Sequence, residues 1–137
     1  MTVIIHGGVV DIYTDGSSKP NSPTGKARVG IVFVFQDKII YESGTNIGRG
    51  TNNYAEFVAV NIALTRAYEM GFRRANVFGD STLVIDGING RINIKKPTLL
   101  RQYMATEYQK TLYDWITFTY IPRNTGYHKI ADQLSKQ

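Results

Sequence analysis

The sequence predicts an α/β fold in which a five-stranded mixed sheet is flanked by helices. Three extended segments follow one another before the first helical segment, which predicts an antiparallel meander. Two later strands alternate with helical segments, which predicts right-handed crossovers and parallel pairing. The predicted element order is therefore β-β-β-α-β-α-α-β-α, with helices on both faces of the sheet. A length of 137 residues suits one domain, which we expect to span residues 1–137.

The meander is predicted from residue type and alternation. Residues 8–15 are rich in β-branched and aromatic residues, as strands are. Residues 16–26 are rich in Gly, Ser, Pro and Lys and are expected to form a loop. Apolar residues alternate over residues 27–35, which predicts a strand with one face toward the core. A short turn at residues 36–38 then leads into a third strand at about residues 39–47.

The helices are predicted from apolar residues that recur on one face at about 100° per residue. The first helix is expected to have Asn52 or Asn53 as its N-cap and to stop at Gly71. Its apolar face is broad, and Glu56 falls inside it. The helix that follows residue 96 has apolar residues spaced by four, which predicts a packed face. These residues are Leu100, Met104, Tyr108 and Leu112.

The rest of the chain completes the predicted order. The remaining elements are a strand at residues 74–79, a helix at 81–88, a helix at about 97–113, a strand at 115–121 and a helix from about residue 127.

Composition is that of an ordinary globular protein with a basic surplus. The residues are 42% hydrophobic and 20% charged, the formal net charge is +5, and the isoelectric point is near 9.5. A basic chain with a cluster of acids suggests a polyanionic substrate and bound cations, although a modest surplus of Lys and Arg also simply aids solubility. The sequence contains no cysteine, which excludes disulfides and thiolate metal sites. Residues 1–8 lack the features of a signal peptide and no membrane span is predicted, so we expect a cytoplasmic protein.

Four acidic residues stand where a solvated surface charge is not normally placed. Asp15 and Asp80 each end an apolar run that is predicted to be a strand. Glu56 lies on the apolar side of the first long helix, and Asp132 lies in the last helix. Functional sites of parallel sheets lie beyond the carboxyl ends of the strands, so these side chains can meet there. Carboxylates that meet repel one another unless cations join them, and a divalent metal site acting on phosphate is the usual reason to tolerate this.

Each of these residues also has an ordinary interpretation. Glu56 could lie at the solvated edge of its helix, Asp80 could be the N-cap of the helix that follows, and Asp132 could be a surface acid. Asn52 and Asn53 could cap the first helix and do no more.

Four short segments resemble ribonuclease H of type 1. They are residues 13–17 (Tyr-Thr-Asp-Gly-Ser), 51–56 (Thr-Asn-Asn-Tyr-Ala-Glu), 79–81 (Gly-Asp-Ser) and 130–134 (Ile-Ala-Asp-Gln-Leu). Each segment is weak by itself, but all four occur in order over nearly the whole chain. The resemblance is to the compact form without a basic protrusion, and it implies the ribonuclease H-like fold. It also implies an endonuclease that cleaves the RNA strand of RNA–DNA hybrids and leaves 5′-phosphate and 3′-hydroxyl ends.

The resemblance implies a two-metal centre. Two Mg²⁺ ions about 3.5–4 Å apart would straddle the scissile phosphate, with Mn²⁺ as a substitute. By resemblance, Asp15 bridges both ions. Glu56 and Asp80 then hold one ion, and Asp132 holds the other. Hard cations prefer oxygen ligands, which agrees with a site made of carboxylates.

The resemblance also implies residues that contact the substrate. Asn52 and Asn53 match positions that contact the minor groove, where the 2′-hydroxyl distinguishes RNA from DNA. Thr51 matches the position that binds a phosphate of the DNA strand. The other substrate-contacting positions are matched by Ser18, Asn21 and Thr82. We expect the protein to act as a monomer.

The chain departs from the family pattern in two places. His128 stands four residues before Asp132, where the family usually has Asn, and Arg123 lies in the loop where many relatives carry a mobile His. In those relatives the loop His is associated with proton transfer and product release. Here we expect His128 to lie in the first turn of the last helix instead of the loop and Arg123 to supply charge in the loop, and both are candidate auxiliary residues. Lys95 and Lys96 lie where larger relatives carry the basic protrusion, so they are either solvated or in contact with substrate. Compact relatives sometimes also cut double-stranded RNA, which leaves that substrate open.

Two alternatives stand beside the nuclease. One is a noncatalytic nucleic-acid-binding module of the same fold, and the other is a related DNA strand-transfer or exonuclease domain. Inactive relatives typically lose a metal carboxylate, whereas this chain keeps all four candidates. The Thr-Asn-Asn sequence at residues 51–53 fits the reading of 2′-hydroxyls and so weakens the DNA-directed alternative.

Overall fold

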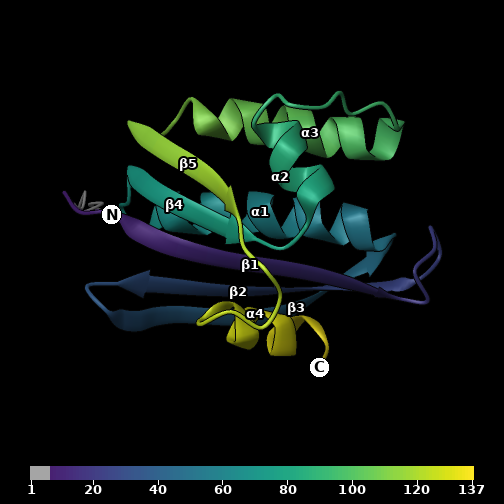
Figure 1. Ribbon diagram of the computed structural model, residues 1–137, viewed down its shortest axis with the longest axis horizontal. Coiled ribbons are helices and arrows are strands. Elements are labelled where there is room, and N and C mark those ends of the chain that lie inside the picture. Colours follow the sequence, from purple (N-terminus) through teal and green to yellow (C-terminus); the bar gives the residue numbers. More distant parts are fainter. Residues whose placement is uncertain (1–6) are drawn as a thin grey trace.

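Five strands form one mixed sheet in the order β3-β2-β1-β4-β5 (Figure 1). The structure is a computed structural model and describes residues 7–137. The strands are β1 (Val10–Lys19), β2 (Lys26–Phe35), β3 (Lys38–Arg49), β4 (Arg74–Gly79) and β5 (Trp115–Tyr120). The helices are α1 (Asn52–Glu69), α2 (Thr82–Ile88), α3 (Pro97–Lys110) and α4 (His128–Ser135).

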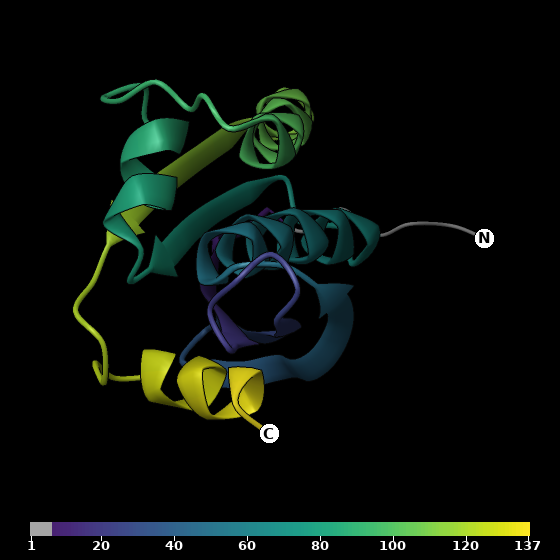
Figure 2. The ribbon, with the colours of Figure 1, turned by 90° about the vertical axis from the view of Figure 1, so that its right-hand side faces the viewer.

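The strands pair as the predicted element order requires. β1 with β2 and β2 with β3 are antiparallel, whereas β1 with β4 and β4 with β5 are parallel. Helices α1 and α2 pack on one face of the sheet, α3 packs against α1, and α4 packs on the opposite face (Figures 1 and 2). The predicted mixed sheet with helices on both faces is confirmed.

The expectation about a signal peptide concerns residues 1–8, and residues 1–6 of that stretch lie outside the described residues. Among residues 7–137, no helix has both the length and the apolar character needed to cross a membrane.

The first strand is longer than predicted. We expected a loop at residues 16–26, but β1 continues to Lys19 and β2 begins at Lys26, so the loop shrinks to residues 20–25. Antiparallel pairing between the two strands extends as far as Lys19 and Lys26. This pairing satisfies backbone hydrogen-bonding groups, and that gain outweighs the weak strand preference of Gly and Ser.

The N-cap of α1 is Thr51, and the prediction of Asn52 or Asn53 is wrong. The Thr51 hydroxyl accepts a hydrogen bond from the Tyr54 N–H at 3.1 Å, and its backbone is extended, as an N-cap requires. Asn52 and Asn53 already lie inside the helix. The side chains of both asparagines are therefore not needed for the cap.

Three of the four apolar residues in the predicted stripe of α3 face solvent, contrary to the prediction; the fourth, Leu112, lies beyond the end of the helix and packs against the core. Met104 and Tyr108 are 62% and 67% exposed, whereas Leu99 and Thr106 are buried. The packed face is partly polar, because the Thr106 hydroxyl donates to the side-chain oxygen of Asn61 in α1 at 2.9 Å. A periodic apolar spacing does not identify the packed face when the partner helix offers a buried hydrogen bond.

The main core lies between the sheet and helices α1 to α3. Val29, Ile31 and Phe33 of β2 are fully buried there, as their alternation predicted. The other face of β2 is buried too. Under α4 the buried members of a smaller apolar cluster are Val32, Val34 and Ala131.

Two glycines let helix backbones rest directly on the sheet. A Cβ at Gly16 would lie 2.4 Å from the carbonyl carbon of Ala55 in α1, and a Cβ at Gly30 would lie 2.0 Å from the carbonyl oxygen of Ala131 in α4. Ordinary van der Waals contact begins near 3.4 Å, so a side chain at either position would push its helix away. These glycines therefore set how closely α1 and α4, which carry two of the four acids, approach the sheet.

Candidate functional site

Two of the four acids meet where β4 ends beside β1. Parallel pairing of these strands stops at Tyr13 and Phe78, and two residues further along each chain lie Asp15 and Asp80. Asp15 is inside β1, which continues along β2, but it lies beyond the parallel pairing with β4. Asp15 is 1% exposed. The register of the two strands thus places one buried carboxylate opposite the other.

The other two acids reach the same point from helices on opposite faces of the sheet. Glu56, in the second turn of α1, is 7% exposed, so its solvated-edge interpretation is wrong. Asp132 lies in the middle of α4. The side chains of Glu56 and Asp132 both lie close enough to Asp15 to shift its pKa, and Lys136 pairs with Asp15 and Asp132 together. The predicted four-acid cluster is therefore formed, with Asp15 at its centre.

Burial and mutual repulsion raise the pKa of two of these carboxyl groups. The pKa of Glu56 lies well above its ordinary value because the group is buried and because the charge of Asp15 lies beside it. Burial likewise raises the pKa of Asp15, against the opposing effect of a hydrogen bond with Glu56. The charge of Asp80 adds to both increases. Ionising these groups without a cation therefore costs free energy.

Two cationic side chains form ion pairs with the carboxylates. Lys136 Nζ is 3.5 Å from Asp15 Oδ2 and also pairs with Asp132 Oδ1. Arg123 Nε is 3.2 Å from Asp80 Oδ2. Partial burial would raise the pKa of Asp132, but hydrogen bonds with Lys136 and Asp15, together with the positive charges of Lys136 and Arg123, outweigh it, and the net pKa is lowered. Two basic residues of the C-terminal segment, Arg123 and Lys136, thus partly neutralise the acid cluster.

Two serines tie the end of α4 to β1. Ser135 Oγ donates to Asp15 Oδ2 at 2.8 Å, and Ser17 Oγ donates to the carbonyl oxygen of Ser135. These bonds hold Asp15 from the α4 side of the sheet. Neither serine was singled out from the sequence.

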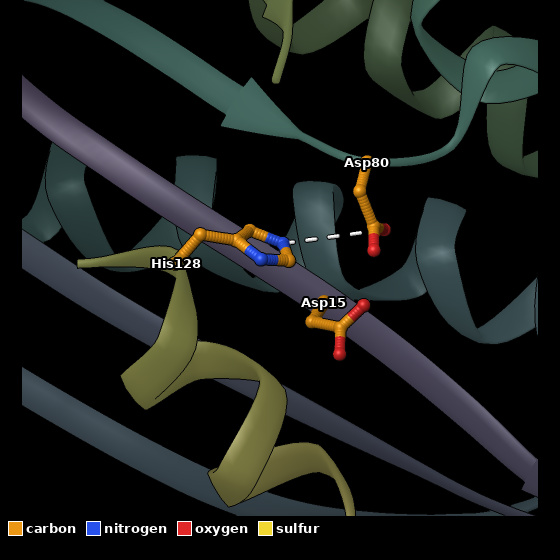
Figure 3. A group of neighbouring side chains, drawn as sticks. All are labelled: Asp15, Asp80 and His128. Carbon is orange, nitrogen blue, oxygen red and sulfur yellow. Dashed lines mark ion pairs between the residues drawn. The ribbon is translucent and has the colours of Figure 1, made fainter. Parts of the chain in front are cut away.

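His128 is the first residue of α4 and is fully buried. Its Nε2 lies 3.2 Å from the carbonyl oxygen of Thr14 and 4.0 Å from Asp80 Oδ1. Ligand atoms of His128, Asp80 and Asp15 lie within 4.8 Å of one another, and Figure 3 shows the ring pointing from α4 toward both acids. Arg123, by contrast, remains in the preceding loop and its side chain is 62% exposed. Of the two predicted auxiliary residues, Arg123 is the one placed to move.

A cleft opens over two of the four acids, and it brings together part of the predicted substrate set. Its lining includes Glu56 and Asp80 together with Ser18, Asn52 and Asn53. The remaining lining residues are Gly16, Ser17, Lys19, Ser81, Arg123 and Lys136.

The turn after β1 is fastened to the start of α1 by asparagine side chains. Asn52 Oδ1 accepts a hydrogen bond from the Ser18 N–H at 2.6 Å, and Asn21 Oδ1 accepts one from the Asn52 N–H at 2.9 Å. This arrangement fixes the edge of the cleft on which Asn53 is exposed. Asn52 and Asn21 therefore have a structural role whatever they contact in a substrate.

The other predicted contacts lie outside the cleft lining. Thr82 is exposed at the start of α2, and Lys95 and Lys96 are exposed in the connector before α3. The N-cap of α2 is Ser81, so the interpretation of Asp80 as a mere cap is wrong.

A second hollow with basic residues lies at the start of α1. Its lining includes Thr51, the predicted contact of a DNA-strand phosphate, together with Arg49 and Arg101. The two arginines were not singled out from the sequence, because an arginine in a basic chain carries no distinctive signal.

The donor set fits divalent cations that prefer oxygen. All four acids offer carboxylate oxygens, and burial raises the pKa of both Asp15 and Glu56, a cost that a bound cation would offset. The fold and the acid cluster together define an α/β domain with a candidate metal centre at the open end of its parallel strands.

Comparison with known proteins identifies the family. The RNase H family model matches residues 8–137, and the chain belongs to the RNase H family. This family is metal-dependent. Ribonuclease HI of Halobacterium salinarum is 38% identical over 132 residues, which make up 96% of this chain and 64% of that protein. A bifunctional protein of Mycobacterium tuberculosis is 34% identical over 130 residues, which make up 90% of this chain and 34% of that protein. The chain thus spans well under the full length of these curated relatives.

Solved structures agree with this assignment. RNase H1 from Halobacterium salinarum has a TM-score of 0.88 at 38% identity, with 94% of this chain and 96% of that chain covered. LC11-RNase H1 in complex with an RNA/DNA hybrid has a TM-score of 0.85 at 29% identity, with 93% of this chain and 94% of that chain covered. The predicted ribonuclease H-like fold and the resemblance stated from the sequence are both confirmed.

Proposed function

We propose that this chain is a metal-dependent endonuclease that hydrolyses the RNA strand of RNA–DNA hybrids and leaves 5′-phosphate and 3′-hydroxyl ends. The observation that carries the proposal is the convergence of four acids, with Asp15 at the centre, beneath a cleft lined by polar side chains. Membership of the RNase H family supports the same reaction.

The proposed cofactor is a pair of Mg²⁺ ions, with Mn²⁺ as a substitute. Asp15 lies near both Glu56 and Asp132, each of which affects its pKa, and this central position suits a ligand shared by two ions. Glu56 and Asp80 would complete one site, and Asp132 would complete the other. When bound, such ions lower the pKa of a water molecule and stabilise negative charge on a leaving oxygen.

The chain's own cations would change partners when metal and substrate bind. Lys136 and Arg123 neutralise the carboxylates in the structure, and both side chains are accessible enough to move. A metal ion would replace their charge at the acids. Arg123, in its loop, would then be able to pair with a phosphate of the substrate, because Arg binds phosphate through several N–H donors.

Substrate contacts are proposed along two surfaces. Ser18, Asn52 and Asn53 line the cleft and would contact the minor groove, where the RNA 2′-hydroxyls lie. Thr51, flanked by arginines in the second hollow, would hold a phosphate of the DNA strand. Because the cluster and both hollows are formed within one chain, we propose that a monomer is sufficient for activity.

Cleavage of end-labelled duplexes tests the function. The wild-type protein should cut the RNA strand of a hybrid in Mg²⁺ or Mn²⁺ and should be inactive in EDTA. Double-stranded RNA, double-stranded DNA and single-stranded RNA of the same sequence serve as controls, and cleavage of double-stranded RNA would add a second substrate. Binding of the hybrid without cleavage in either metal would instead support a noncatalytic binding module.

A further inference from the structure

We propose that His128 is a positioning residue of the acid cluster, which holds Asp80 and β1 in the arrangement that binds metal. This role rests on the proposed function, because it concerns the same centre. It differs from the role of the loop His in relatives, since a fully buried ring at the start of a helix cannot act as a mobile loop group.

The position of the proton on the ring follows from its neighbours. Nε2 lies near two acceptor oxygens: the carbonyl oxygen of Thr14 at 3.2 Å, within hydrogen-bonding distance, and Asp80 Oδ1 at 4.0 Å, beyond it. Because a carbonyl oxygen can only accept, the hydrogen bond to Thr14 requires a hydrogen on Nε2, whether the ring is neutral or charged. Nδ1 is buried and has no hydrogen-bond partner among the described residues. Nε2 is therefore a donor in this arrangement and not a bare nitrogen that could bind a metal ion.

The two acceptors belong to segments that carry metal-site carboxylates. Thr14 directly precedes Asp15 in β1, and Asp80 directly follows β4. His128 itself begins α4, which also carries Asp132. One ring thus connects three of the four segments on which the cluster depends, at the point shown in Figure 3.

The histidine is also the contact of Asp80 that is shielded from solvent. Arg123 holds the other oxygen of Asp80, but its side chain is exposed and lies in a loop. If Arg123 turns toward a substrate phosphate, the buried His128 ring stays in place and still restrains Asp80. Groups that position metal ligands without binding the metal commonly contribute about 10- to 100-fold to metal affinity or activity.

Calorimetric titration of Mg²⁺ and Mn²⁺ into the metal-free protein, without substrate, tests the proposal. His128→Leu keeps an apolar side chain of similar size without a donor, and it should weaken metal binding by about 10-fold or more. His128→Gln can place an amide N–H near the position of Nε2, and it should restore most of the affinity. Val34→Ala, in the small cluster under α4, loosens the same helix without contacting the acids and should bind metal as the wild type does.

Two results would overturn the proposal. One is wild-type metal affinity in His128→Leu. The other is loss of the Nε2 proton on metal binding, observed by NMR of the ¹⁵N-labelled imidazole, because it would make His128 a direct ligand. The NMR measurement uses the wild-type protein and so remains decisive if His128→Leu does not fold. Failure of the proposed function is distinguishable, because it would appear as absence of hybrid cleavage by the wild type while the metal titrations still report on His128.

Discussion

Replacing Gly30 with Ala should disable the site without touching any of its functional groups. Gly30 pairs with Asp15 across β1 and β2, and the backbone of α4 rests on it. A Cβ at this position would lie 2.0 Å from the carbonyl oxygen of Ala131 and 2.8 Å from the backbone nitrogen of Ser135. Both contacts are with backbone atoms, which cannot move aside as the end of a flexible side chain can.

The size of the effect follows from these distances. Ordinary contact begins at 3.4 Å, so α4 must move by the difference from 2.0 Å, about 1.4 Å. The helix carries Asp132, and a displacement of about 1 Å at a catalytic group can reduce the rate about 100-fold. Overpacking of this kind costs about 1–3 kcal/mol of stability. For a domain of this size that loss corresponds to a fall in Tm of roughly 4–12 °C.

The assay combines cleavage kinetics with thermal unfolding. Gly30→Ala should remain folded at 25 °C, melt earlier than the wild type, and show a lower kcat on the hybrid. Gly7→Ala is the matched control, because a Cβ there meets nothing within 4 Å. A folded Gly30→Ala protein with wild-type kcat would refute the view that α4 must lie directly on β2 for activity.

Three further changes have expected outcomes of different kinds. The folded-state pKa of Glu56 is raised, so the contribution of this group to stability is complete below its ordinary pKa of 4.5 and is lost as pH rises through the folded-state pKa. Glu56→Gln should therefore raise Tm in EDTA at neutral pH and flatten the dependence of Tm on pH. An unchanged profile of Tm against pH would contradict the burial of an ionisable group at this position. Lys136→Met removes a cation that pairs with two carboxylates, so it should lower Tm in EDTA and enlarge the rise in Tm that Mg²⁺ produces. The same rise in Tm as in the wild type would show that the lysine does not compete with metal. Tyr113→Phe removes a buried hydrogen bond to the carbonyl oxygen of Leu64 and should cost about 1 kcal/mol in denaturant titrations while leaving cleavage unchanged, and a loss of cleavage would reveal coupling to the site.

The sequence predicted the part of the site that depends on element type and strand ends. Asp15 and Asp80 were found because both end apolar runs, and the parallel register then places them opposite each other. Glu56 was identified because its charged side chain falls within the apolar face of a helix, where a solvated surface charge is not normally placed. In each case the local sequence was sufficient, because neighbouring residues determine where a strand ends and which face of a helix is apolar.

The contacts made by α4 could not be predicted in the same way. Spacing alone indicates that Lys136 can pair with Asp132 one turn earlier, but its contact with Asp15 depends on how α4 lies across the sheet. That placement comes from the close approach at Gly30, which a lone glycine in a strand pattern does not reveal. The exposed stripe of α3 was misread for a related reason, because buried polar pairs on the opposite face hold that helix.

The most direct test of the central claim is the rate of RNA-strand cleavage by Asp15→Asn at saturating Mg²⁺. Asn has nearly the same shape as Asp but lacks the negative charge, and the loss of charge relieves repulsion with Glu56, so the variant should fold and be at least as stable as the wild type in EDTA. Because metal ions at such sites contribute several kcal/mol of transition-state stabilisation, the rate should fall by at least about 1,000-fold. A folded Asp15→Asn protein that cleaves the hybrid at the wild-type rate would contradict the claim that the four acids form the catalytic metal centre.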